Sequence, residues 1–458
     1  MTRRSDLRPA LLLAALLLPG CKDKEPIEPI YTHNDWTDAD RIGTLPDFYE
    51  KRPKNVLMIS VDTFRRDHVG YFGDKDLTPN LDALAAGGVA LENHTTCANW
   101  TFAGVTCTVR GAYNVDNGFI PRLSQDAQAP IPGDPGTLAG WLSDAGYYTV
   151  LHSGNSWFSK LWNNANGFDK VLTGRKWAAF PLAQDGLIHI QEKVLDGTAR
   201  NGWYLHVHLM EPHAPYVPPS EYIDGISELD PVPWDLTDKD DHYEALAQWP
   251  VMDQDTRDLL EKHLRTRYEG ELKYWDDQLL QIIADASRRG LLEDTVVVLW
   301  NDHGEQFWEH GYQTHAYTLF REENDGWAIF WAPNIVPQAW SGPTVSIDIV
   351  PTLLRLLEVD IPPEVTGLPL GDRPDDTVRY GTSVARLGAV QYVRQGDWKL
   401  NFNWTGTARL YDLSTDPGET TNLFDPADEK SIEMWNLLEP WVDKTVPLVE
   451  DFTPNKPL

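Results

Sequence analysis

The sequence predicts an α/β fold in which helices cover a sheet, followed by a smaller C-terminal subdomain. Short apolar runs rich in β-branched residues alternate with segments of helical spacing, which is the pattern of layered α/β proteins. After Gly367 the pattern changes to short strands and turns. We therefore expect a main domain over residues 55–375 and a C-terminal subdomain over residues 376–458.

The expected elements of the main domain follow one another along the chain. Residues 56–61 form an apolar run typical of a buried strand that ends at Asp62. Pro79 stands where a proline is tolerated, at the first position of a helix. Further strands are expected at residues 147–151, 204–209 and 295–300, and helices at residues 79–88, 138–145 and 265–289. The C-terminal subdomain is expected to contain short strands at residues 392–393, 398–402 and 410–413, and a helix at residues 432–442.

The composition is that of a folded, strongly acidic protein. Of 458 residues, 41% are apolar and 24% are charged, and the formal net charge is −30. Such a surface repels nucleic acid and anionic lipid headgroups, so neither is expected as an electrostatic partner. It also repels an anionic substrate, which would need a local positive centre. A bound cation is the simplest such centre.

The first 20 residues are expected to be a lipoprotein signal peptide. Arginines precede an apolar run over residues 10–18, which is shorter than the roughly 20 residues that span a bilayer. The segment Leu18-Pro19-Gly20-Cys21 resembles a bacterial lipobox, so Cys21 is the expected lipidation site and residues 21–54 a lipid-anchored tether. The alternative is an ordinary signal peptide with an incidental cysteine. We expect an exported protein on the periplasmic or cell-surface side. Lys22, by analogy with other lipoproteins, favours the outer membrane.

Besides Cys21, the sequence contains only two cysteines. Cys97 and Cys107 can pair if the compartment is oxidising, and the sequence leaves this pairing open.

Two acidic residues stand at the ends of expected strands. Asp62 follows the first strand, and Asp302 with His303 follows the strand at residues 295–300. Ligands of open α/β sheets lie outside the carboxyl ends of the strands, and carboxylates with an imidazole suit Zn²⁺, Mn²⁺ or a similar ion. A single aspartate at a strand end is more commonly only a cap.

Histidines gather near the same strand ends. His208 and His213 lie in or just after the strand at residues 204–209, while His310 and His315 follow the turn that contains His303. A lone histidine is usually a satisfied surface or core residue, and the clustering is what favours a site here.

Five segments in order resemble motifs of the sulfatase family, within the alkaline phosphatase superfamily. They are residues 55–68, 78–84, 301–305 with 309–311, 348–354, and 410–413 through 416–423. Each motif is weak alone, whereas five at family spacing are specific. The resemblance implies a three-layer sandwich with a central, mostly parallel sheet, plus a smaller C-terminal α+β subdomain.

The sequence departs from that family at the nucleophile. Aligning residues 110–113 with the family's Thr-Gly-Arg-Tyr segment places Thr101 where sulfatases carry a cysteine or serine that is oxidised to formylglycine. Ala103 and Val105 replace the accompanying proline and arginine, so formylglycine is not expected. In this respect the chain is similar to lipoteichoic acid synthases and phosphoethanolamine transferases, which use an unmodified threonine.

That resemblance implies one divalent metal ion on Asp62, Thr101, Asp302 and His303. The family's usual second aspartate is Thr63 here. Calcium-binding sulfatases carry asparagine at the position of His303, so Zn²⁺, Mn²⁺ or Mg²⁺ is expected rather than Ca²⁺.

The sequence predicts a hydrolase of sulfate or phosphate esters, carried by a small molecule or a glycan. Thr101 would be the nucleophile, His213 and His315 would hold oxygens or protonate the leaving group, and His208 and His310 would bind substrate. The alternative is a catalytically silent surface lipoprotein that binds a glycan or partner. Loss of the proline and arginine near Thr101 favours this alternative, whereas retention of all four expected ligands opposes it.

Overall fold

A central sheet of eight strands organises the computed structural model. The structure describes residues 41–123, 129–133, 136–172, 178–223, 229–449 and 453–458, together with residues 37, 39 and 225. The strand order is β10-β2-β9-β6-β1-β5-β3-β4, and only β9 among these strands runs against its neighbours. The strands are β1 (Asn55–Val61), β2 (Val89–Thr95), β3 (Tyr148–Ser153), β4 (Lys170–Leu172), β5 (Trp203–Leu209), β6 (Thr295–Asn301), β9 (Ala328–Trp331) and β10 (Gln338–Val345).

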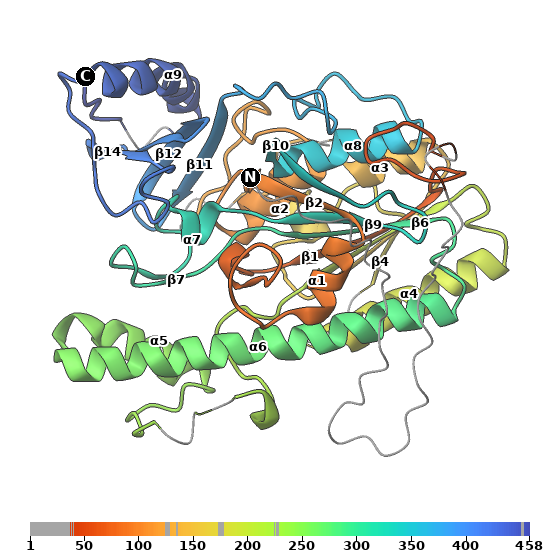
Figure 1. Ribbon diagram of the computed structural model, residues 1–458, viewed down its shortest axis with the longest axis horizontal. Helices are drawn as coiled ribbons and strands as arrows, with labels where there is room; N and C mark the ends of the chain where they lie inside the picture. The colour runs from red at the N-terminus through yellow and green to blue at the C-terminus, as the bar shows by residue number, and fades with distance from the viewer. Residues whose placement is uncertain are drawn as a thin grey trace, which may run out of the picture.

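Helices cover both faces of this sheet, which confirms the expected three-layer sandwich. Alternate side chains of β1 point to opposite faces: Leu57 and Ile59 belong to one core, and Val56 and Met58 to the other. The first core is closed by α1 (Pro79–Ala86), α4 (Ala179–Leu195) and α6 (Gln254–Arg288), and the second by α2 (Thr101–Arg110), α3 (Leu138–Asp144) and α8 (Ile349–Leu356). Figure 1 shows α6 along one side of the sheet and α8 and α3 along the other.

The C-terminal subdomain is a four-stranded antiparallel sheet with one helix on it. Its strands, in spatial order, are β11 (Arg379–Ala385), β12 (Gly388–Gln395), β13 (Trp398–Asn403) and β14 (Thr407–Asp412), and its helix is α9 (Glu429–Thr445). Its core also includes Cys97, Cys107 and Ile347 of the sandwich. The subdomain is therefore packed firmly against the main domain, at the end that carries β7 and α7 (Figure 1).

Several elements differ from the sequence-based expectation. Helix α6 begins at Gln254 rather than at residue 265, because Asp253 caps it through a side-chain bond from Thr256 N. The sequence pattern does not predict strands β2 and β10, because both contain polar residues. It also does not mark the bounds of α2, α4 and β9. In β10, Pro343 lies next to a shift in register at the edge of the sheet, where proline is tolerated.

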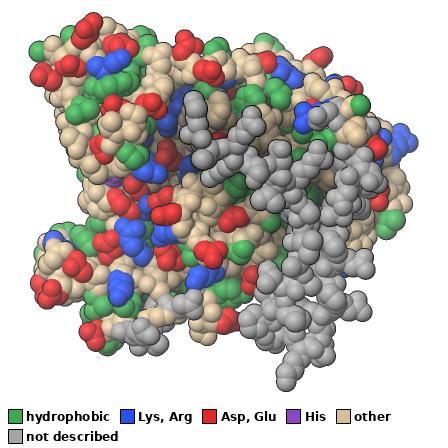
Figure 2. Space-filling view, in the orientation of Figure 1, with side chains coloured by type: hydrophobic (Ala, Val, Ile, Leu, Met, Phe, Trp, Pro, Cys, Tyr) green, Lys and Arg blue, Asp and Glu red, His purple; other side chains and the backbone are tan. Residues whose placement is uncertain are grey.

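The described part of the expected tether packs onto the sandwich. Phe48 is fully buried and forms an isolated bridge with Ile335. Cys21 and the expected signal segment lie outside the described residues. Within the described ranges, no helix has the length and apolar character needed to cross a bilayer. Figure 2 shows acidic side chains spread over the visible face with basic ones among them.

Cys97 and Cys107 form a disulfide in the structure. Cys97 lies in the loop after β2 and Cys107 lies in the second half of α2, so the bridge ties this helix to the loop that precedes it.

Candidate metal centre and catalytic site

The register between β1 and β6 brings Asp62 and Asp302 together. The two strands are parallel neighbours, with Val61 opposite Asn301, so the next residue of each strand emerges at the same edge. The amide of Asp302 donates to the carbonyl of Val61 at 3.2 Å and holds this alignment beyond the last paired residues. Each carboxylate thus follows the end of its own strand, and because the two strands are neighbours, both carboxylates lie in one site at the edge of the sheet.

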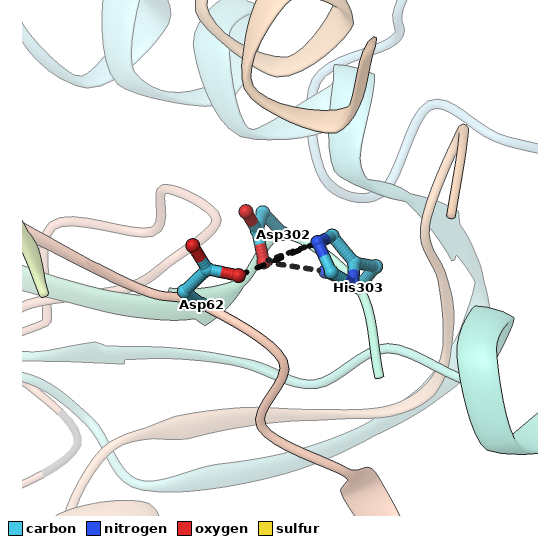
Figure 3. Close-up of side chains that lie close together, drawn as sticks. All are labelled: Asp62, Asp302 and His303. Atoms are coloured by element: carbon cyan, nitrogen blue, oxygen red, sulfur yellow. Dashed lines mark hydrogen bonds and ion pairs between the residues drawn. The ribbon is translucent and has the colours of Figure 1, made fainter. Parts of the chain in front are cut away.

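Asp62, Asp302 and His303 form a compact and fully buried donor group (Figure 3). The Nε2 atom of His303 lies 3.4 Å from Asp62 Oδ1 and 3.7 Å from Asp302 Oδ1. The His303 Nδ1 atom donates to the carbonyl of Gly304 at 2.9 Å. Because a carbonyl only accepts, the neutral ring keeps its lone pair on Nε2, on the side of the carboxylates.

The donor group contains polar atoms that the protein itself does not satisfy. Asp62 Oδ1, Asp302 Oδ2 and His303 Nε2 are buried, and none has a hydrogen-bond partner among the described residues. Buried polar atoms normally form hydrogen bonds, and a group of buried atoms without such partners requires an explanation, for example a bound ion. Two carboxylate oxygens and one imidazole nitrogen within reach of one another fit a divalent cation such as Zn²⁺ or Mn²⁺.

Electrostatics in the group are dominated by burial and by the close pair of carboxylates. Burial and the neighbouring Asp62 charge raise the pKa of Asp302 well above its ordinary value. Burial alone would raise the pKa of Asp62 as well, but the nearby His213, His208 and His303 lower it. Two buried acidic groups side by side are costly without a cation, and this repulsion agrees with a metal-binding role.

Thr101 stands beside Asp62 at the first turn of α2. Its Oγ1 atom donates to Asp62 Oδ2 at 3.3 Å, and its side chain is almost fully buried. The residue before it, Trp100, has extended backbone, so the helix starts at the threonine. The amide groups of a helix N-terminus favour negative charge, and α2 therefore presents Thr101 at a position suited to an anionic ester.

Asn155 joins this group and was not expected from the sequence. Its Nδ2 atom donates to Asp62 Oδ2 at 2.7 Å and lies 3.3 Å from Thr101 Oγ1. It follows β3, two strands away from β1 in the same sheet. Its position just after the carboxyl end of a strand is the signal that could have revealed it.

Two histidines flank Thr101 around a small cavity. The rings of His213 and His315 are 5.3 Å apart, and the ring of His315 is 4.5 Å from that of His303. His213 Nδ1 donates to the carbonyl of Ala214 at 2.7 Å, and His315 Nδ1 lies 3.0 Å from Glu305 Oε1. Both histidines line a cavity of about 150 Å³ together with Thr101. The structure thus brings these three predicted residues together.

The other two predicted histidines, His208 and His310, do not line this cavity. His208 is fully buried behind Asp62, with Nδ1 2.8 Å from Ser60 Oγ and Nε2 3.7 Å from Asp62 Oδ2, and it does not line the cavity. The structure separates His310 from the group. The β7–β8 hairpin, β7 (Gln306–Phe307) and β8 (Gln313–Thr314), carries His310 at its tip, where its ring stacks on Phe320 at 3.7 Å.

Several cavity-lining residues carried no signal in the sequence. The cavity wall also includes Trp100, Leu123, Trp157, Tyr243 and Arg386. Arg386 comes from the turn between β11 and β12 in the C-terminal subdomain, where its amide donates to the carbonyl of Ala316 at 3.1 Å. Its guanidinium supplies positive charge beside the cavity on a protein that is acidic overall.

Comparisons with known proteins agree with this fold. The family model described as Sulfatase matches residues 54–359. An arylsulfatase of Clostridium perfringens is 23% identical over 449 residues, which cover 82% of this chain and 91% of that protein.

Solved structures share the fold at low sequence identity. The structure of BT4656 in complex with its substrate D-glucosamine-2-N,6-O-disulfate has a TM-score of 0.68 at 18% identity, covering 88% of this chain and 99% of that one. A phosphonate monoester hydrolase from Silicibacter pomeroyi has a TM-score of 0.64 at 20% identity, covering 86% of this chain and 95% of that one.

Proposed function

The chain belongs to the sulfatase family of ester hydrolases, and we propose that it is a metal-dependent enzyme for sulfate or phosphate esters whose nucleophile is the unmodified Thr101. The observation that carries the proposal is the position of Thr101 Oγ1. It lies 3.3 Å from Asp62 Oδ2, beside a buried donor group with three unpaired ligand atoms. Thr101 stands where the family carries formylglycine, so its hydroxyl would attack the ester in place of that group.

One divalent ion would be held by Asp62, Thr101, Asp302 and His303. When bound, it supplies positive charge that favours ionisation of a hydroxyl and stabilises the charge that builds up on ester oxygens. The orphaned atoms of the three buried ligands support this assignment, and their oxygen and imidazole chemistry favours Zn²⁺, Mn²⁺ or Mg²⁺ over Ca²⁺.

The protein's own residues then perform nucleophilic catalysis in two steps. Thr101 Oγ forms a bond to the sulfur or phosphorus atom, and the bond from that atom to the leaving oxygen breaks. The hydrogen bond from Thr101 to Asp62 Oδ2 gives the hydroxyl proton an acceptor in the structure. In their protonated forms, His213 and His315 hold non-bridging oxygens or deliver a proton to the leaving oxygen. Attack of water on the threonine ester releases the anion and restores the hydroxyl.

The nucleophile sets the expected preference between the two ester classes. A threonine side chain cannot become formylglycine without losing a carbon, so a sulfated Thr101 would require direct hydrolysis. Hydrolysis of a phosphothreonine between two histidines and a cation is easier than that reaction. We therefore expect phosphate monoesters or diesters to be turned over faster than sulfate esters.

Kinetics on chromogenic esters test the proposal. Purified full-length protein would be assayed with p-nitrophenyl sulfate, p-nitrophenyl phosphate and bis-p-nitrophenyl phosphate. Thr101→Ala should abolish turnover, and Thr101→Ser, which keeps the hydroxyl, should retain a measurable part of it. Mass spectrometry after rapid quench should show a phosphoryl or phosphodiester adduct on the Thr101 peptide. Robust sulfatase activity in Thr101→Ala would overturn both the nucleophile and the preference for phosphorus.

A further inference from the structure

A second and larger cavity lies between the sandwich and the C-terminal sheet. Its volume is about 570 Å³, which falls within the range of about 300–1,000 Å³ typical of small-molecule sites. One wall is formed by the loop of the β7–β8 hairpin, with Tyr312, and by the segment after the hairpin, with Tyr317 and Phe320. The other is formed by β12, β13 and β14. None of these residues takes part in the donor group around Asp62.

The wall contributed by the C-terminal sheet is polar. Asn401 pairs with Arg409 in the register of β13 and β14, and Asn403 pairs with Thr407, so these four side chains share one face of the sheet. The opposite face carries Leu400 and its neighbours, which pack into the core with α9. A stable sheet needs only one apolar face, and the second face here lines the cavity with amide, hydroxyl and guanidinium groups.

One of these groups is buried with an unsatisfied atom. The side chain of Asn401 is 9% exposed, and its Oδ1 atom has no hydrogen-bond partner among the described residues. Its Nδ2 atom reaches Glu419 Oε1 at 3.5 Å. An unpaired amide oxygen in the wall of a cavity is an acceptor for a hydroxyl or amide of a ligand.

The facing wall is aromatic. The rings of Tyr312 and Tyr317 are stacked 5.0 Å apart, and the edge of one ring in the Phe320–Tyr411 pair packs on the other at a ring distance of 6.0 Å; all four residues line the cavity. Tyrosine rings offer an apolar face and a polar tip. Rings on one side and amides and hydroxyls on the other match a sugar, which has apolar C–H faces and a rim of hydroxyl groups.

The charges around the cavity favour an anion. The two carboxylates in its wall are engaged inside the protein: Glu309 with Arg65 and Arg265, and Glu419 with Lys399 at 2.8 Å. Among the residues that the structure describes, Arg409 forms no ion pair, and it is exposed. The cavity therefore offers a free guanidinium on a protein whose net charge is −30.

The two cavities adjoin each other. Arg386 lines the catalytic cavity, and its guanidinium lies 5.1 Å from the centre of the Tyr317 ring, which lines the second cavity. Leu387, the next residue, also lines the second cavity. The Arg386–Tyr317 contact forms the boundary between the two cavities, so a chain-like ligand that occupied both would lie over this contact.

We propose that the second cavity binds the sugar units next to the ester-bearing unit of an anionic oligosaccharide, with Arg409 facing a sulfate or carboxylate on those units. This assignment rests on the proposed hydrolase function and names its substrate class. The ester-bearing unit would occupy the cavity at Thr101, and the neighbouring units would lie on Tyr312 and Tyr317 against Asn401 and Arg409.

Binding measurements can test the assignment independently of turnover. Full-length protein carrying Thr101→Ala, which should not consume the probe, would be titrated by calorimetry with tetrasaccharides of chondroitin sulfate and heparan sulfate. Glucosamine 6-sulfate serves as the single-unit probe and cellotetraose as the uncharged one. Arg409→Gln and Tyr312→Leu would each be added to this background. Arg288→Gln, an exposed arginine at the far end of α6, is the matched control.

We expect at least one anionic tetrasaccharide to bind tenfold or more tightly than glucosamine 6-sulfate, and cellotetraose to bind no better than the single unit. Arg409→Gln and Tyr312→Leu should each remove most of this gain, whereas Arg288→Gln should leave it intact. Equal thermal unfolding midpoints would show that the variants are folded. The proposal is overturned if no tetrasaccharide shows the gain, or if the gain survives both cavity variants. Failure of the hydrolase proposal would show separately, as absent turnover of the p-nitrophenyl esters by protein that retains Thr101.

Discussion

The side-chain amide of Asn155 lies 2.7 Å from the Oδ2 atom of Asp62. The same amide is 3.3 Å from Thr101 Oγ1, so one donor contacts both an expected metal ligand and the proposed nucleophile. Its own Oδ1 atom accepts from the amide of Trp157 at 2.9 Å, which orients the side chain. Asn155 is thus a positioning residue that holds Asp62 and is placed to donate to the threonine oxygen during the reaction.

The first prediction tests the donor group of the Asn155 side chain separately from its acceptor oxygen. Asn155→Asp keeps an acceptor for Trp157 but removes the donor, so kcat should fall by about 100-fold, the usual effect of losing one aligned donor. Bound metal should remain at one equivalent. Asn117→Ala, on the loop after α2, is the control and should leave kcat unchanged. Wild-type kcat in Asn155→Asp would remove the residue from the mechanism.

The second prediction concerns the metal. Asp302→Ala deletes one of the three buried ligands and leaves Asp62 without its partner, so elemental analysis should show loss of one equivalent of divalent metal, and activity should fall at least ~100-fold. The control is Asp276→Asn. Asp276 is a buried residue of α6 whose carboxylate accepts hydrogen bonds from the amides of Asn80 and Leu81 at the start of α1. This variant should keep the metal. An undiminished metal content in Asp302→Ala would refute the ligand assignment.

The third prediction concerns stability and pH. Burial raises the pKa of Glu271 from its ordinary value of 4.5 to about 8, and the Glu211 carboxylate adds to the rise. Burial likewise raises the pKa of Glu211, to about 7. Between pH 4.5 and 8 the unfolded chain releases the Glu271 proton while the folded protein keeps it, so rising pH favours unfolding in this window.

Glu271→Gln removes the titrating carboxyl group and therefore the loss of stability that accompanies its ionisation. It keeps an acceptor for the amide of Val217, which lies 2.7 Å from the native carboxylate. The free energy of unfolding at pH 8 should rise by about 3–4 kcal/mol relative to the wild type, with little change at pH 5. Denaturant titrations at both pH values measure this difference. Glu293→Gln, on the exposed loop before β6, should show no such pH-dependent gain. An equal effect at pH 5 and pH 8 would contradict the role of ionisation.

The fourth prediction concerns the membrane anchor that we propose at Cys21. The lipobox-like segment Leu18-Pro19-Gly20-Cys21 motivates it. Cys21→Ser should move the protein from the membrane fraction to the soluble fraction, because acyl chains contribute about 0.8 kcal/mol per buried methylene. Cys97→Ser, which leaves the lipobox intact, is the control and should remain in the membrane fraction. A Cys21→Ser variant that resists detergent-free washing would count against lipidation.

Much of the sandwich could be predicted because its strands are buried on both faces. The segments that form β1 and β6 are almost entirely apolar, and β5 is apolar apart from His206 and His208, so all three are easily recognised in the sequence. Strands with mixed composition were harder to recognise. In β2, Glu92 is exposed and His94 is buried, so its pattern follows contacts with β9 and β10 that lie far away in the chain.

The histidines show the limit of clustering along the chain. His310 and His315 are close in sequence and follow the same turn, yet only His315 lines the catalytic cavity. The hairpin formed by β7 and β8 reverses the chain between them. Spacing alone does not record that reversal.

The fold class and the strand ends that carry Asp62, Asp302 and His303 can be predicted from local patterns, because burial leaves a run of apolar residues and parallel strands share one functional edge. The contact of Asn155 with Asp62, the place of Arg386 in the cavity at Thr101 and the pairing of Cys97 with Cys107 are visible only in the folded protein. These contacts join loops from different strands and from the C-terminal subdomain. Which loops meet depends on strand order and on the packing of the two sheets, and neither leaves a periodic signal in the residues concerned.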